Sequence, residues 1–411
     1  MMLVFQISLI VILLVWLTAM IAAYQYGRIG RLLTRREQSV AAPTTALPPL
    51  SVVICTHNQA LALRRHLPAI LEQDYDNFEV IVVDAASDDE TKDVLERLEF
   101  QYSNLRHTFT PTSARDISIE RLAITLGFRA AAHEWVVLTR PDCEPQSQQW
   151  LLRLGETIAT PQCSPQSPRL KQPDMVIGLT RFDTQRSTWL DSKTSFYRLS
   201  HAMSLVHHIL DGHAAVTADR CNLAFRKSYF MENGGFKDAQ NLKTGAVELL
   251  VNHTSTPSNT ALMLAPSAMM IQDRLSSHHQ WKKQRVFYAE TQRHQHHTAL
   301  FRFKQFWRHL IPWLTLVFLV LPWLACIAVL AAQIETVSSL YFVIPALVLP
   351  ILFIILSAIK IAQLHLTTLA LGYRSYYLSL LLLELRLPLW ELSARFSRRL
   401  TSPNEFRKKF V

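Results

Sequence analysis

Two carboxylates follow a buried-strand pattern near the centre of the chain. Residues Trp135–Thr139 form an apolar, β-branched run, and Asp142 and Glu144 come shortly after it. Such a run is typical of a strand covered on both faces, and open α/β sheets bind ligands just past the carboxyl ends of their strands. Carboxylate oxygens suit Mg²⁺ or Mn²⁺, whereas the intervening Arg140 could pair with a diphosphate or with a neighbouring carboxylate. Asp142 and Glu144 are therefore the candidate metal ligands.

Two earlier strand patterns, at 51–55 and 78–84, also end in polar residues. Those residues are Thr56, His57, Asn58 and Asp84. A helical pattern follows each of these strands, and another helix, at about 117–131, precedes the Trp135–Thr139 strand. Alternating strands and helices with carboxylates at strand ends predict an α/β domain with a parallel, Rossmann-like sheet.

Three runs of sequence resemble family 2 glycosyltransferases of the GT-A fold, most closely a membrane-anchored bacterial type. SVVICTHNQALALRRHLPAILEQDYDNFEVIVVDAASDDET, from Ser51, is similar to the family's first βαβ unit. CNLAFRKSYFMENGGF, from Cys221, and LKTGAVELLVN, from Leu242, resemble later motifs. The resemblance covers about residues 50–300 in motif order and spacing. It implies a nucleotide-sugar-binding domain, a UDP-sugar as the expected donor, and Mg²⁺ or Mn²⁺ as the family's cofactor.

The resemblance also implies which residues bind the nucleotide. They are Thr56, His57, Asn58, Asp84, Arg140 and Asp142. His57 takes the position of a ring that stacks on uracil, and Asp142 matches the second acid of the family's metal-binding DxD motif. Arg140 stands where the first acid belongs, and its positive charge would repel a dication. A metal site at Asp142 and Glu144 is thus weakened by its own sequence.

The position that aligns with the family's catalytic base is Val247, which cannot accept a proton. Glu248 could act as the base only if the register shifts, because neighbouring side chains on a helix diverge by about 100°. Its alternative role is that of a surface or capping residue. Asn222, Trp281 and Arg285 match the segments that bind the acceptor and close over the diphosphate. A basic helix that faces the membrane would explain Trp281 and Arg285 equally well.

Two functions follow from this pattern. The first is an inverting glycosyltransferase that moves a sugar from a nucleotide donor to a lipid-linked or cell-envelope saccharide at the cytosolic face. The second is a catalytically inactive homologue that acts as a binding or scaffold subunit for a protein partner. The family favours the first, while the replacements at Arg140 and Val247 favour the second.

The composition indicates a membrane protein, because 49% of the 411 residues are hydrophobic and the mean hydropathy is +0.12. Three stretches are long and apolar enough to span a bilayer: Leu3–Tyr24, Ile311–Gln333 and Val337–Ile359. Arginines at 28–36 place the following domain in the cytosol. The net charge of +10 is concentrated beside these stretches, so we expect anionic lipid of a bacterial inner membrane, not nucleic acid, as the partner.

The expected organisation has five segments. Residues 1–27 form an N-terminal transmembrane anchor, 28–49 a juxtamembrane linker, and 50–300 the cytosolic GT-A glycosyltransferase-like domain. Residues 301–360 form a hairpin of two transmembrane helices. Residues 361–411 form interfacial or re-entrant helices and a basic cytosolic tail, with a fourth span through Leu378–Leu383 as the alternative.

Overall fold

The computed structural model divides the chain into two compact units. One comprises Ser39–His297 and Ser393–Val411, and the other comprises Met1–Gln38 and Thr298–Leu392. The residues that the structure describes are 27–31, 46–111, 118–164, 167–183, 188–237, 245–320, 340–373, 376–377 and 379–402, with a few isolated positions between 16 and 24 and between 323 and 328.

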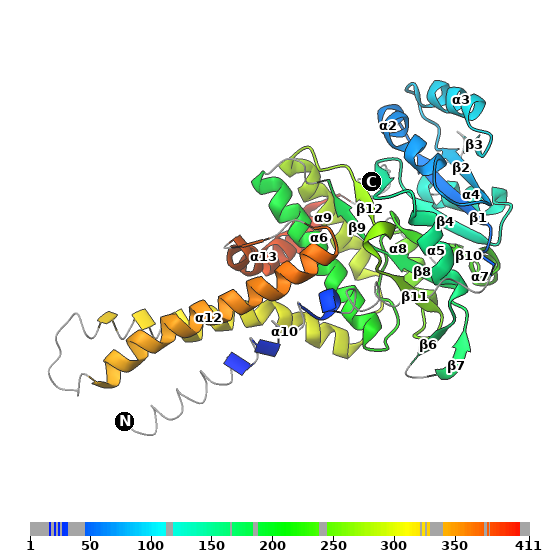
Figure 1. Ribbon diagram of the computed structural model, residues 1–411. Helices are drawn as coiled ribbons and strands as arrows, with labels where there is room; N and C mark the ends of the chain where they lie inside the picture. The colour runs from blue at the N-terminus through cyan, green and yellow to red at the C-terminus, as the bar shows by residue number, and fades with distance from the viewer. Residues whose placement is uncertain are drawn as a thin grey trace. The chain divides into compact units, whose positions relative to one another are not determined.

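The first unit is built on a seven-stranded sheet with the order β11-β8-β10-β4-β1-β2-β3 (Figure 1). These strands are β1 (Leu50–Thr56), β2 (Phe78–Asp84), β3 (Leu105–Phe109), β4 (Trp135–Thr139), β8 (Met175–Gly178), β10 (Leu223–Arg226) and β11 (Thr260–Met263). Strands β1 to β4 are parallel, and β10 lies antiparallel between β4 and β8. The predicted Rossmann-like α/β sheet is confirmed, with β10 as an antiparallel insertion.

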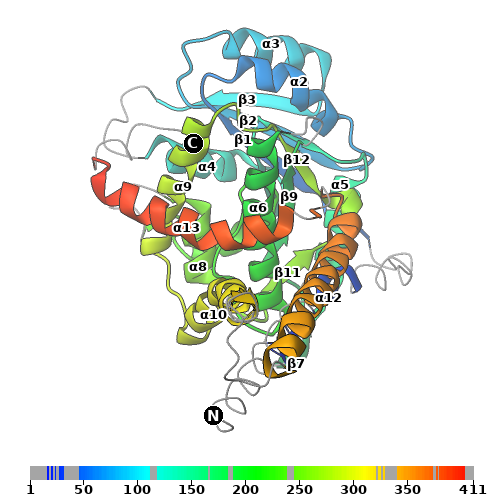
Figure 2. The same ribbon diagram turned by 90° about the vertical axis from the view of Figure 1, so that its left-hand side faces the viewer.

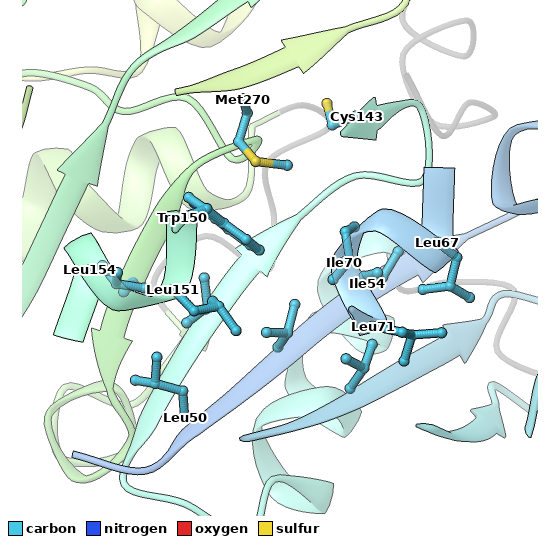
Figure 3. Packing of buried hydrophobic residues seen from close by; sticks show 14 of the residues in the cluster. Leu50, Ile54, Leu67, Ile70, Leu71, Cys143, Trp150, Leu151, Leu154 and Met270 are labelled. Carbon is cyan, nitrogen blue, oxygen red and sulfur yellow. The ribbon is translucent and has the colours of Figure 1, made fainter. Parts of the chain in front are cut away.

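Helices cover both faces of this sheet (Figure 2). Their bounds are α2 (Ala60–Leu71), α3 (Thr91–Gln101), α4 (Ile119–Ala130) and α5 (Trp150–Ala159). Leu50 and Ile54 of β1 pack in one buried cluster with side chains of α2 and α5, among them Trp150 (Figure 3). Helix α4 lies against the other face, where a Cβ on Gly127 would come 2.3 Å from Val53. Side chains alternate along a strand, so β1 is buried on both sides, as its apolar run predicts.

A second, three-stranded sheet lies where the chain leaves β4. Its strands are β5 (Cys143–Pro145), β12 (Met270–Gln272) and β9 (Thr180–Phe182), in the order β5-β12-β9. The remaining elements are β6 (Gln162–Ser164), β7 (Ser167–Lys171), α6 (Trp189–Leu210), α7 (Lys227–Glu232), α8 (Val247–Thr254), the 3-10 turn η2 (Pro266–Ala268) and α9 (His278–Arg293). The second sheet brings residues near 270 beside the end of β4.

The other unit is helical in the residues described. Its elements are α10 (Ala299–Thr315), a π-helical turn (Leu316–Val320), α12 (Leu340–Ala370) and α13 (Ser379–Leu400), which belongs to it as far as Leu392. Residues Leu347–Ala370 of α12 have a mean hydropathy of 2.3 and are, among the described residues, the one stretch long and apolar enough to cross a membrane.

This candidate span differs from the prediction in its bounds. The helix does not end at Ile359 but continues through Lys360, which forms a 3.2 Å ion pair with Glu384 while both side chains are buried. A charge neutralised inside the unit does not require the helix to end there. Most of the predicted span at 3–24 and part of that at 311–333 lie outside the described residues, so the count of three spans is not confirmed.

Candidate active site

The carboxyl ends of β1 and β2 are joined by hydrogen bonds between their loops. His57 Nδ1 lies 2.9 Å from the carbonyl oxygen of Ala85. Asp84 Oδ1 accepts hydrogen bonds from the backbone N–H and the hydroxyl of Ser87, at 3.1 and 2.5 Å. Asp84 therefore shapes the β2 turn, and the position of His57 is tied to that turn.

Two residues at these strand ends have left-handed backbones, Asn58 with φ 53° and Ala86 with φ 55°. Asn tolerates this region, whereas Ala is strained in it, and such strain concentrates at ligand sites. The backbone N–H of Asn58 donates to Ser87 Oγ at 2.9 Å, which fixes the turn. The hydroxyl of Thr56 is buried with no hydrogen-bond partner among the described residues.

At the end of β4, Arg140 and Asp142 form a two-pronged ion pair. Arg140 Nε lies 2.8 Å from Asp142 Oδ1, and its Nη2 lies 3.2 Å from Oδ2. Gln272 of β12 also donates to Oδ2, at 2.8 Å. Burial acts to raise the pKa of Asp142, but the Arg140 guanidinium and these hydrogen bonds outweigh it and hold the pKa below its usual range. Asp142 is therefore the ionised partner of Arg140 at neutral pH.

Glu144 lies in a separate cluster. Its carboxylate is 3.0 Å from Nδ1 of the buried His66 on α2, whose Nε2 is 3.0 Å from Asp273. This imidazole joins β5 to the segment that follows β12. Glu144 is therefore paired with His66, whereas Asp142, only two residues earlier in the sequence, is paired with Arg140.

These contacts decide whether a divalent cation fits at Asp142 and Glu144. A dication at a diphosphate requires converging anionic oxygens. Here the Arg140 guanidinium forms an ion pair with the carboxylate of Asp142, and the His66 imidazole contacts the carboxylate of Glu144. Within the described part of the chain, no three His, Cys, Asp or Glu side chains gather as a metal site. The residues present do not fit the Mg²⁺ or Mn²⁺ that the family resemblance implies.

A pocket opens at the carboxyl ends of β1 and β4. Its empty space, including the open mouth, is about 510 Å³. The polar or charged residues of the lining are Cys55, His57, Gln59, Glu120, Thr139, Arg140 and Arg220. Val247 also lines it, at the start of α8. Of the predicted nucleotide-binding residues, His57 and Arg140 thus line one pocket. Val247, the position that aligns with the family's catalytic base, lines the same pocket.

Sequence reasoning missed Glu120 and Arg220, which form an ion pair in this pocket. Glu120 lies in the first turn of α4, and Arg220 comes three residues before β10. Burial raises the pKa of the Cys55 thiol to about 12, an effect that the Arg220 guanidinium partly opposes. One signal could have found Glu120: the helix before a parallel strand starts at the edge where the sheet's strands end.

Glu248 turns back onto its own helix. Its Oε2 accepts a hydrogen bond from the backbone N–H of Ala246 at 3.1 Å, at the start of α8. Arg121 lies nearby and donates to the carbonyl oxygen of Gly245 through Nε and Nη2, at 2.9 and 2.6 Å. Glu248 is not among the residues that line the pocket. Its geometry is that of a helix cap.

The three residues predicted for the acceptor or closing segment lie in the interior. Asn222 is 1% exposed and bonds Trp150 Nε1 at 3.0 Å as well as two backbone carbonyls at 2.9 Å. Two cations contact the Trp281 ring, with Lys193 Nζ at 4.3 Å and the Arg285 guanidinium at 3.9 Å from its centroid. Burial lowers the pKa of Arg285. Tyr197 also packs edge-on against the Trp281 ring, so the ring is surrounded by side chains of the protein.

Comparison with known proteins identifies what part of the chain is similar to. Residues 51–231 match the family described as "Glycosyl transferase family 2". Glycosyltransferase AglE of Haloferax volcanii is 30% identical over 118 residues, which are 28% of this chain and 37% of that protein. The match thus spans little more than a third of that relative's length.

A solved structure shares the fold. The mannosyltransferase PcManGT of Pyrobaculum calidifontis, in complex with GDP-Man and Mn²⁺, superposes with a TM-score of 0.52 at 17% identity, over 94% of this chain and 99% of that one. The expected family resemblance and the α/β fold are both confirmed. The sequence match to glycosyl transferase family 2 covers residues 51–231, which contain the β1 and β4 edges of the pocket, and the solved structure shares the fold over most of the chain.

Proposed function

We propose that this protein is a membrane-anchored glycosyltransferase that binds the diphosphate of its nucleotide-sugar donor with arginines in place of a metal ion. The observation that carries the proposal is the pocket at the ends of β1 and β4, where Arg140 and Arg220 both contribute to the lining. Guanidinium groups donate paired hydrogen bonds to phosphate oxygens and keep their charge when partly buried. A diphosphate would thus meet two fixed cations at the sheet edge where α/β folds bind ligands.

The neighbouring strand ends would hold the nucleoside. His57 is positioned by Ala85 and faces the same pocket, and base stacking on an aromatic ring contributes about 1–3 kcal/mol. Thr56 is fully buried and is not among the residues that line the pocket. We expect a UDP-sugar as donor. GDP-mannose is the alternative to include, because PcManGT was solved with it.

The acceptor is proposed to be a lipid-linked or cell-envelope saccharide at the cytosolic face of a bacterial inner membrane. Support comes from the apolar stretch Leu347–Ala370 and from the arginines at 28–36, which favour a cytosolic position for the domain after them. A reporter fused after Val411 should therefore score as cytosolic. An external reporter would require another span near Leu378 and would remove the topological part of the proposal.

Calorimetry of UDP and GDP binding tests the donor site. The purified full chain is titrated with each nucleotide in EDTA and again in Mn²⁺, and sugar transfer is followed under both conditions. We expect one nucleotide to bind equally well in both buffers. Transfer that EDTA abolishes would contradict metal-free binding, whereas binding without any transfer would favour the inactive homologue.

A further inference from the structure

The pocket contains a carboxylate with no assigned role. Glu120 enters it from the first turn of α4, and Val247 enters it from the first turn of α8. Val247 holds the place where the family resemblance puts the catalytic base, and it offers only methyl groups. The carboxylate of Glu120 therefore lies in the same pocket that the missing base would have served.

Two other nearby carboxylates, those of Asp142 and Glu248, already accept hydrogen bonds from other groups of the protein. Asp142 is bound by Arg140 and Gln272, and Glu248 caps α8. Neither Asp142 nor Glu248 lines the pocket. Of the described residues that do line it, Glu120 is the one with a carboxylate. Its partner is Arg220, and the two side chains keep 20% and 15% of their surface exposed. Both groups are thus reachable by a ligand that enters the open pocket.

We propose that Glu120 is the proton acceptor for glycosyl transfer and that Arg220 restrains it until a donor diphosphate is bound. This inference rests on the proposed function. A carboxylate paired with a guanidinium is a poor base, because protonation would cost it that ion pair. A diphosphate carries more negative charge than one carboxylate and competes for Arg220, so donor binding would free Glu120.

The chemical step then balances with the groups already named. The acceptor hydroxyl loses its proton to the Glu120 carboxylate as its oxygen forms a bond to the anomeric carbon of the donor sugar. The bond from that carbon to the diphosphate oxygen breaks, and its electron pair leaves with the nucleoside diphosphate. Arg140 and Arg220 would stabilise the charge that develops on this leaving group. No oxidant, reductant or further reactant is required.

Glu120→Gln tests the base directly, since it keeps the shape of the side chain but cannot take a proton. We expect kcat to fall about 10²- to 10⁴-fold, the usual contribution of a general base. Nucleoside diphosphate affinity should instead rise about two- to five-fold, the range for losing a competing ion pair at a partly exposed position. Glu96→Gln, at an exposed Glu of α3 paired with Lys92, is the matched control.

Binding and turnover together distinguish the possible outcomes. Lost turnover with retained or tighter binding of the nucleoside diphosphate supports the role of Glu120, and partial recovery of Glu120→Ala by sodium formate would strengthen it. A kcat within threefold of the wild type overturns it while leaving donor binding intact. Weaker nucleotide binding by Glu120→Gln refutes the restraint by Arg220. If the wild type itself binds no nucleotide, the proposed function falls, and this inference with it.

Discussion

Replacing Arg140 by Ala should weaken nucleoside diphosphate binding strongly. In the structure the Arg140 guanidinium contacts both oxygens of Asp142, at 2.8 and 3.2 Å, and also lines the pocket. The substitution removes one positive charge and exposes the negative charge of Asp142 to the phosphates. Both changes act against an anionic ligand.

The magnitude follows from the geometry. At about 4 Å and an effective dielectric constant near 20, two unit charges interact by about 4 kcal/mol. The Arg140 and Asp142 side chains are 18% and 19% exposed, so solvent screens part of that value. A hydrogen bond to a charged group contributes about 1.5–3 kcal/mol, which corresponds to a loss of about 10- to 160-fold in affinity.

Calorimetry with UDP or GDP in EDTA measures this loss. Arg140→Lys should fall between the wild type and Arg140→Ala, because an ammonium keeps the charge but cannot donate the paired hydrogen bonds. Arg64→Ala removes a surface arginine, 55% exposed and paired with Glu90, and should leave the affinity unchanged. An Arg140→Ala protein that binds as tightly as the wild type would refute the assignment of Arg140 to the diphosphate.

A double substitution that restores the missing acid tests whether charge at this strand end controls metal binding. Arg140→Asp together with Pro141→Ala restores an acid beside Asp142 and relaxes the turn, so nucleotide binding should become dependent on Mn²⁺. The gain reflects a change of two charge units at the position where the guanidinium now lies. Continued insensitivity of this double variant to EDTA would show that charge at this strand end does not govern metal binding.

Three further predictions concern stability and reactivity. Asn222→Ala should lower the free energy of unfolding by about 2–4 kcal/mol in urea, since Trp150 Nε1 and two carbonyls lose their buried partner; a change below 1 kcal/mol would contradict this. Glu248→Ala should cost about 1 kcal/mol in the same assay as a lost helix cap, and a 100-fold fall in kcat would instead identify Glu248 as the base. Cys55, whose pKa is raised to about 12 by desolvation, should resist iodoacetamide at pH 8, because the thiolate is then about one part in 10⁴ and grows only toward pH 12; rapid labelling seen by mass spectrometry would contradict the raised pKa.

The sequence predicted the framework better than the chemistry. Strands β2 and β4 have the bounds expected from their apolar runs, because a strand buried on both faces leaves a local signal. The antiparallel insertion of β10 left no such signal, since strand direction depends on which distant strand it pairs with. That insertion delivers Arg220 to the pocket, so this residue could not be found from spacing alone.

Whether a contact of a site residue could be predicted from the sequence depended on how far along the chain its partner lies. The sequence allowed a pair between Arg140 and a neighbouring carboxylate, and Asp142 is two residues away. The partners of Glu144 and Asp142 are His66 on α2 and Gln272 on β12, which lie 78 and 130 residues away in the chain. Contacts over such separations depend on tertiary packing, which residue types at a strand end do not reveal.

The insertion of β10 beside β4 has a consequence for the nascent chain. Strands β1 to β4 are complete once Thr139 has been made, but the partner of the open edge of β4 begins at Leu223, 84 residues later (223 − 139). At about 5–20 residues per second, that edge stays unpaired for about 4–17 s on the ribosome. Its sequence, Trp-Val-Val-Leu-Thr, is apolar and β-branched, the type of edge that recruits other chains. Aggregation during synthesis, more than instability of the finished fold, is therefore the hazard that this topology imposes on the cell.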